Sequence, residues 1–173
     1  MSMTKYFFDI NAPEVAASLF AHSKLAKEDP DFITRHCGQF PVIFVSFGGA
    51  RATTWEEMRV KIIDLISTVY YQHEYLLATD GFLTGPKRKE FLATLEKDPS
   101  VVFEFALRKL TELLHRYHKK RVIVLIDEYD KPVNEAFENG YYKEALAFLV
   151  PAFTGCLKDN PYSFISFSSA PKM

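Results

Sequence analysis

Apolar residues follow two patterns along the chain, short unbroken runs and longer stretches with helical spacing. Val122 to Ile126 are five consecutive apolar residues, four of them β-branched. Such a run is too short for a helix and predicts a strand buried on both faces. A second run at 40–47 predicts another such strand, and 163–167 predicts a short third one.

Apolar residues with helical spacing lie between these runs and predict the intervening helices. The expected helices cover about 3–10, 12–27, 54–77, 87–97, 101–118, 131–139 and 141–157. Thr54 and Glu57 predict a capping box, and Val102 and Phe105 are expected to be buried. Pro151 is expected to kink or break the last helix. Helices that alternate with buried strands predict an α/β fold with a parallel sheet.

Length and composition indicate one globular domain over residues 1–173, with 48% hydrophobic and 25% charged residues. A net charge of −1 gives no electrostatic footprint for nucleic acid or anionic lipid. Two cysteines are too few for a disulfide framework, and no signal peptide or membrane-length apolar run is present. The cytoplasm is therefore the expected location.

Candidate chemistry lies at the end of the central run. The segment Arg121 to Asp130 ends its apolar strand with Asp127 and Glu128, and ligands of open parallel sheets bind beyond the carboxyl ends of strands. A buried strand ending in Asp-Glu is typical of the Walker B motif, in which the Asp holds Mg²⁺ and the Glu polarises water. A solvated turn in which Asp caps the next helix would give the same residue types.

Other candidate sites have simpler interpretations. No Gly-x-x-x-x-Gly-Lys-[Ser/Thr] phosphate loop occurs in the 173 residues, and Gly48-Gly49 is interpreted as a turn. Glu112, His115 and His118 lie three residues apart, as metal ligands on a helix do. The basic end of a solvated helix is the preferred explanation, since the sequence shows no second helix that bears ligands.

The segment Leu125 to Pro132, with the sequence Leu-Ile-Asp-Glu-Tyr-Asp-Lys-Pro, closely resembles the predicted AAA-ATPase-like family, as do 134–136 and 139–142. Lys5 to Asp9, the strand from Phe40 and the helix start at Thr54 are further similarities. The resemblance reaches to about Asn160. It implies a partial P-loop NTPase-like three-layer sandwich, with a short parallel sheet flanked by helices.

In that family a strand and a phosphate loop precede the segment that resembles Met3 to Asp9, and a nuclease domain often follows. The sequence is therefore expected to be a fragment that lacks the first strand and the phosphate loop, and residues 166–173 depart from the family pattern. By resemblance, Asp127 is the carboxylate associated with Mg²⁺ and Glu128 the catalytic one that activates water. Mg²⁺ and ATP are thus the implied cofactors, but ATP is not expected to bind usefully to this chain alone.

The family topology would leave 163–167 as an exposed strand edge. Together with 16 Phe and 9 Tyr, this edge predicts self-association or a protein partner. One alternative function is a non-catalytic protein-interaction module on an α/β scaffold. Another is a metal-dependent hydrolase that uses Asp127, Glu128 and Asp130 directly, although adjacent strand residues point to opposite faces.

Overall fold

The computed structural model describes residues 2–158 and 160–168, and its centre is a parallel sheet of three strands in the order β1-β2-β3. The strands are β1 (Val42–Ser46), β2 (Val122–Asp127) and β3 (Ser163–Ser168). The register joins Val42 to Ile123 and Val122 to Ser163. The predicted α/β fold with a short parallel sheet is confirmed.

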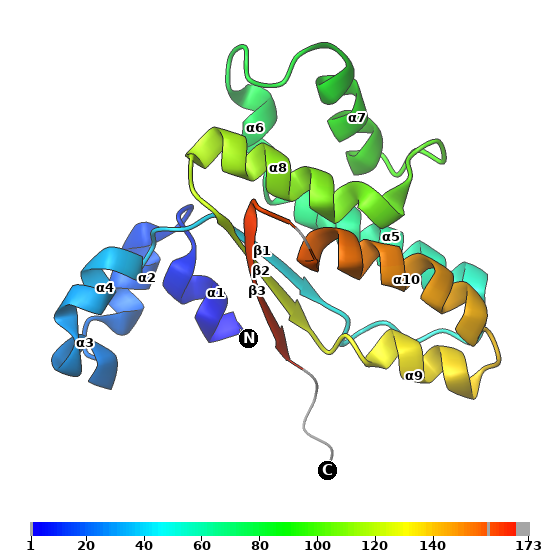
Figure 1. The fold of residues 1–173 in the computed structure, drawn as a ribbon, viewed down its shortest axis with the longest axis horizontal. Helices are drawn as coiled ribbons and strands as arrows, with labels where there is room; N and C mark the ends of the chain where they lie inside the picture. Colours follow the sequence, from blue (N-terminus) through cyan, green and yellow to red (C-terminus); the bar gives the residue numbers. More distant parts are fainter. Residues whose placement is uncertain (1, 159, 169–173) are drawn as a thin grey trace.

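Helices precede and connect the strands (Figure 1). Before β1 come α1 (Ser2–Phe8), α2 (Pro13–Phe20), α3 (Lys24–Glu28) and α4 (Pro30–His36). Between β1 and β2 lie α5 (Trp55–Tyr71), α6 (Tyr75–Ala78), α7 (Gly85–Leu95), the 3₁₀ turn η1 (Phe103–Phe105) and α8 (Ala106–His118). Between β2 and β3 lie α9 (Lys131–Glu138) and α10 (Tyr142–Leu157).

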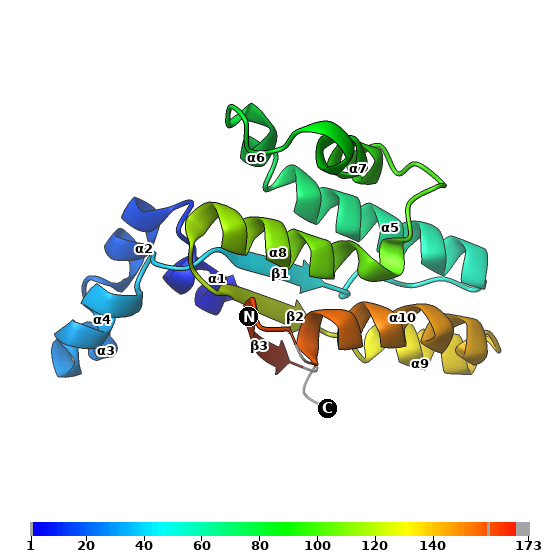
Figure 2. The same ribbon diagram turned by 45° about the horizontal axis from the view of Figure 1, so that its top comes forward.

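The core lies between one face of the sheet and helices α5, α8 and α10, which Figure 2 shows stacked over the strands. Ile43 and Val45 of β1 and Val124 and Ile126 of β2 are each at most 2% exposed and belong to this core. Alternate residues point to the opposite face. On that face the ammonium group of Lys5 in α1 lies 5.9 Å from the centre of the Phe44 ring.

The N-terminal lobe, α1 to α4, differs from the sequence prediction. The helix expected over 12–27 ends at Phe20, because the Ser23 hydroxyl caps a new helix by accepting the Ala26 N–H at 3.1 Å. A further helix, α4, was missed. Its N-cap is Asp29, whose carboxylate accepts the Phe32 N–H at 2.9 Å, and Asp-Pro is a helix-start signal.

Aromatic rings fill this lobe and account for part of the high aromatic content. Ring centroids are 5.0 Å apart for Phe7 and Phe20 and 5.9 Å for Phe8 and Phe40. The backbone also joins the lobe to the sheet, since the Ile10 N–H donates to the Phe40 carbonyl at 2.8 Å. The segment before α2 therefore lies along the outer side of β1 at its beginning.

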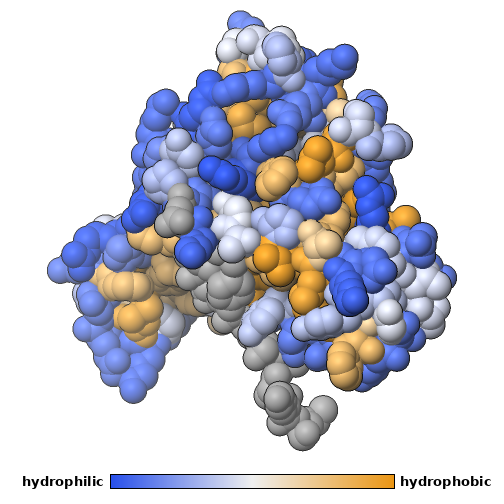
Figure 3. All heavy atoms as spheres, turned by 45° about the vertical axis from the view of Figure 1, so that its right-hand side comes forward, coloured by the Kyte–Doolittle hydropathy of each residue, from blue (hydrophilic) through white to orange (hydrophobic). Residues whose placement is uncertain are grey.

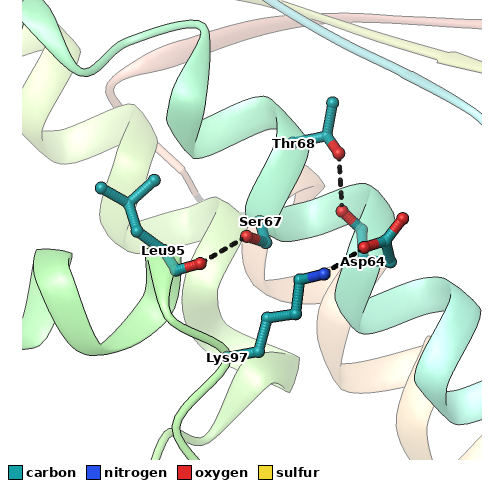
Figure 4. Close-up of polar contacts among 5 residues, drawn as sticks. All are labelled: Asp64, Ser67, Thr68, Leu95 and Lys97. Carbon is teal, nitrogen blue, oxygen red and sulfur yellow. Dashed lines mark hydrogen bonds and ion pairs between the residues drawn. The ribbon is translucent and has the colours of Figure 1, made fainter.

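Helix α5 begins as predicted, with the Thr54 hydroxyl accepting the Glu57 N–H at 3.3 Å. It ends at Tyr71 rather than near 77, and α6 follows after a short turn. Side chains join α5 to the end of α7 (Figure 4): the Ser67 hydroxyl donates to the Leu95 carbonyl at 2.8 Å, and Lys97 pairs with Asp64.

One prediction for the later helices was wrong, and of the two outcomes expected at Pro151 the break does not occur. Val102 and Phe105 are 50% and 43% exposed, because η1 changes the helical phase and places Phe103 in the core at 1% exposure. Helix α10 continues through Pro151 without a break, and the buried neighbours Leu149 and Ala152 show that tertiary packing supports it there. Among the described residues, no helix has both the length and the apolar character needed to span a membrane.

Candidate functional site

Asp127 is the last residue of β2, the central strand, and is half-buried. The register places it between Ser46 of β1 and Ser168 of β3, and its carbonyl accepts the Phe47 N–H at 3.0 Å. Because Ile126 faces the helical core, Asp127 lies on the other face of the sheet. The structure thus places this predicted metal ligand at the middle of the carboxyl edge.

Glu128 leaves the strand through a left-handed backbone conformation, with φ of 54°. A residue other than glycine rarely adopts this conformation, and it ends the alternation of side chains along the strand. The Glu128 carbonyl accepts the Lys131 N–H at 3.1 Å, which closes a turn immediately before α9. Glu128 thus lies outside β2, and the alternation of side chains along the strand does not fix the direction of its carboxylate.

The Glu128 carboxylate lies against the loop that follows β1. A Cβ atom added to Gly48 would be 3.0 Å from Oε1 of Glu128. Gly48 and Gly49 form the expected turn, in which the Ala50 N–H donates to the Phe47 carbonyl at 2.9 Å. Sequence reasoning found the turn but did not connect it to the Glu128 side chain.

Lys131 was also missed. Its ammonium group pairs with Oε2 of Glu128 and donates to the Gly48 carbonyl at 3.2 Å. The spacing of three residues between Glu128 and Lys131 was the available signal. Asp130 is the N-cap residue of α9, but its side chain makes no capping hydrogen bond. Its Oδ1 is buried without a hydrogen-bond partner among the described residues.

The alternative metal ligands on α8 have separate partners. Glu112 lies 3.7 Å from the ammonium group of Lys87, and Nδ1 of His115 lies 3.0 Å from a backbone carbonyl. Nε2 of His118 lies 2.8 Å from the Tyr75 hydroxyl. Each of the three side chains thus has a polar partner within the protein.

No group of three or more His, Cys, Asp or Glu side chains that could hold a metal ion is found in the described part of the chain. Asp127, Glu128 and Asp130 therefore do not form such a cluster there. The donor chemistry still fits Mg²⁺ as nucleotide enzymes use it, because Mg²⁺ commonly takes one or two carboxylates and completes its shell with phosphates and water. Asp127 would be the carboxylate donor in that mode.

A cavity of about 560 Å³ opens beside the same β1–α5 loop. Its apolar lining includes Ala50, Ile63 and Phe103, and its charged lining includes Asp64 and Lys97. Neither Asp127 nor Glu128 lines it. Gly49 belongs to the lining of the cavity, whereas the Glu128 carboxylate lies beside Gly48.

These features define a parallel α/β protein with two consecutive acidic residues at the carboxyl end of its central strand. Comparison with family models identifies the family: the model described as Predicted AAA-ATPase matches residues 1–168, and the chain belongs to this AAA-ATPase-like family. The comparison with curated proteins and the comparison with solved structures gave no match.

Proposed function

We propose that Asp127 and Glu128 form the Walker B half of an ATP-hydrolysis site, with Asp127 associated with Mg²⁺ and Glu128 polarising the attacking water. One observation carries this proposal: Asp127 ends the central strand, and a left-handed turn immediately places Glu128 at the same edge of the sheet. Family membership supports a general dependence on nucleotide and Mg²⁺. When bound, Mg²⁺ would neutralise phosphate charge.

The 173 residues contain no Gly-x-x-x-x-Gly-Lys-[Ser/Thr] segment, and in P-loop NTPases that loop supplies the amides and the Lys that hold the phosphates. We therefore propose that the chain alone does not hydrolyse ATP. Calorimetry with MgATP should show no binding tighter than roughly 100 µM, which corresponds to about −5.5 kcal/mol. Tighter binding would mean that other residues of this chain cradle the phosphates.

A gain-of-function experiment tests the roles of the two carboxylates. A strand and phosphate loop from another family member, joined ahead of Met1, should confer MgATP binding and hydrolysis. Glu128→Gln in this fusion should keep MgATP affinity and lower the hydrolysis rate by about 100-fold or more, the usual contribution of a general base. Asp127→Asn should lower the affinity for Mg²⁺ and so raise the Mg²⁺ concentration that hydrolysis requires.

The matched control is Glu138→Gln, which removes an exposed carboxylate at the end of α9. It should leave hydrolysis by the fusion unchanged. If Glu128→Gln hydrolysed ATP as fast as the unsubstituted fusion, Glu128 would not be the residue that polarises water, and the proposal would be wrong.

We also propose that the chain acts as a protein-interaction module and pairs with a second copy of itself through β3. In the described sheet, β3 pairs with β2 on one side only, and the Phe164 side chain is 46% exposed. Apolar side chains reach the surface at several separate places on the face drawn in Figure 3, including the N-terminal lobe at the lower left. A strand edge adds a directional contact that such scattered patches lack.

A further inference from the structure

The ion pair between Lys131 and Glu128 is the most protected one among the described residues. The two side chains are 33% and 28% exposed, whereas every side chain in the other ion pairs is at least 42% exposed. Exposed pairs are screened by water and contribute little. A pair that is two-thirds buried at the carboxyl edge of the sheet restrains its carboxylate more strongly.

Lys131 contacts two loops at once. Its ammonium group pairs with Glu128 after β2 and donates to the carbonyl of Gly48 after β1. The Glu128 carboxylate therefore lies beside the Lys131 cation and beside Gly48, where an added Cβ would be 3.0 Å from Oε1. Both contacts fix where the carboxylate group lies.

The backbone fixes the position of Lys131 itself. It is the first residue of α9, and its N–H donates to the Glu128 carbonyl at 3.1 Å. The three-residue turn therefore starts from the left-handed conformation of Glu128 and brings the two side chains together. The ion pair is built into the entry of the helix.

We infer that Lys131 is a positioning residue that keeps Glu128 from becoming a metal ligand; this inference rests on the proposed function. Two adjacent carboxylates are both attracted to a divalent cation, and each added carboxylate tightens binding of such a cation. A Glu that coordinates the cation cannot accept a proton from water. The ammonium group of Lys131 supplies the positive charge that Glu128 would otherwise find in the metal.

The affinity of the 173-residue chain for Mn²⁺ tests this inference and requires no enzymatic activity. Electron paramagnetic resonance measures the free ion, and the bound fraction follows from it. Lys131→Met should bind Mn²⁺ about tenfold more tightly than the unsubstituted chain, because Glu128 becomes available as a second carboxylate. Lys131→Arg should restore the weaker binding. In the double variant Lys131→Met with Glu128→Gln, the gain should disappear.

Lys109→Met is the matched control, since Lys109 also pairs with a glutamate, Glu90, but lies on α8. It removes the same charge and should not change Mn²⁺ affinity. Circular dichroism and thermal unfolding of each variant establish that it is folded. Mn²⁺ affinity that is unchanged or weaker in folded Lys131→Met, absent binding included, overturns the inference, as does a gain that persists in the double variant.

The outcome is separable from that of the proposed function. ATP hydrolysis by the fusion tests the proposed function, whereas the Mn²⁺ affinity of the Lys131 variants tests the positioning role of Lys131. Asp127→Asn added to Lys131→Met should lower Mn²⁺ affinity. If it does not, the metal role of Asp127 is wrong, although a gain that depends on Glu128 would still support the role of Lys131.

Discussion

The Glu128 carboxylate and Gly48 are in such close contact that a Cβ at position 48 would lie 3.0 Å from Oε1. We therefore expect Gly48→Ala to displace the carboxylate from its pairing with Lys131 and to lower the free energy of unfolding by about 1 kcal/mol. In a Glu128→Ala background the same substitution should be neutral or slightly stabilising, because alanine restricts the unfolded chain. Urea unfolding of the four proteins completes the double-mutant cycle.

Gly49→Ala is the control for this cycle, because a Cβ at Gly49 would meet nothing within 4 Å. It should show no coupling to Glu128. Equal costs of Gly48→Ala with and without the Glu128 side chain would mean that the two positions do not interact.

Lys119 ends α8 in a left-handed conformation with φ of 56°, and its side chain is exposed. Glycine is the residue that this C-cap position favours. Lys119→Gly should therefore raise the free energy of unfolding by about 1 kcal/mol, which thermal or urea unfolding measures. Lys97 has a similar φ of 58° but pairs with Asp64, so the gain from Lys97→Gly should be smaller. A destabilised Lys119→Gly protein would contradict the prediction.

His73 predicts how stability depends on pH. It is 2% exposed, and burial lowers its pKa to about 4, assisted by the positive charges of His118 and Lys5. Burial also lowers the pKa of His118. The folded state binds the His73 proton less tightly than the unfolded state, in which the pKa is about 6.5. The contribution of neutral His73 to the free energy of unfolding is therefore complete above about pH 6.5 and is lost as the pH falls toward 4. The loss is roughly 3 kcal/mol.

Urea unfolding at pH 7.5 and pH 5 checks this expectation. His73→Asn removes the titrating ring, so the difference in unfolding free energy between the two pH values should become smaller. His22→Asn, at an exposed position, should leave that difference as it is. An unchanged pH dependence in His73→Asn would show that His73 is not the group responsible.

The central features of the fold were predictable because they depend on local patterns. The run Val122 to Ile126 gave the buried central strand, and Thr54 with Glu57 gave the start of α5. The missed features depend on competition between signals. Asp29-Pro30 both ends one helix and starts another, and the packing around Pro151 outweighs the hydrogen bond that the proline removes.

The candidate site was predictable in position but not in its interactions. Asp127 and Glu128 follow from the end of a buried strand. The contact of Glu128 with Gly48 joins residues that are far apart in the sequence, and it requires the left-handed turn at Glu128. A glutamate gives no sequence signal for a left-handed turn, because glycine and asparagine are the residues that usually adopt this conformation. The spacing of Glu128 and Lys131 allowed an ion pair, but the contact of Lys131 with the Gly48 carbonyl could be seen only in the folded chain.

The outer edge of β3 predicts self-association. The Phe164 ring is 46% exposed and is partly covered by the guanidinium group of Arg121, 4.3 Å from its centre. Sedimentation velocity at increasing protein concentration should show a shift from monomer toward dimer or larger species. Phe164→Lys should reduce this shift, because a lysine on an edge strand opposes pairing. Leu19→Lys, at an exposed position in α2, is the control and should not, since that side chain lies outside the strand edge. A monomer at every concentration, without apolar surface that binds dye, would show that the edge does not pair in solution.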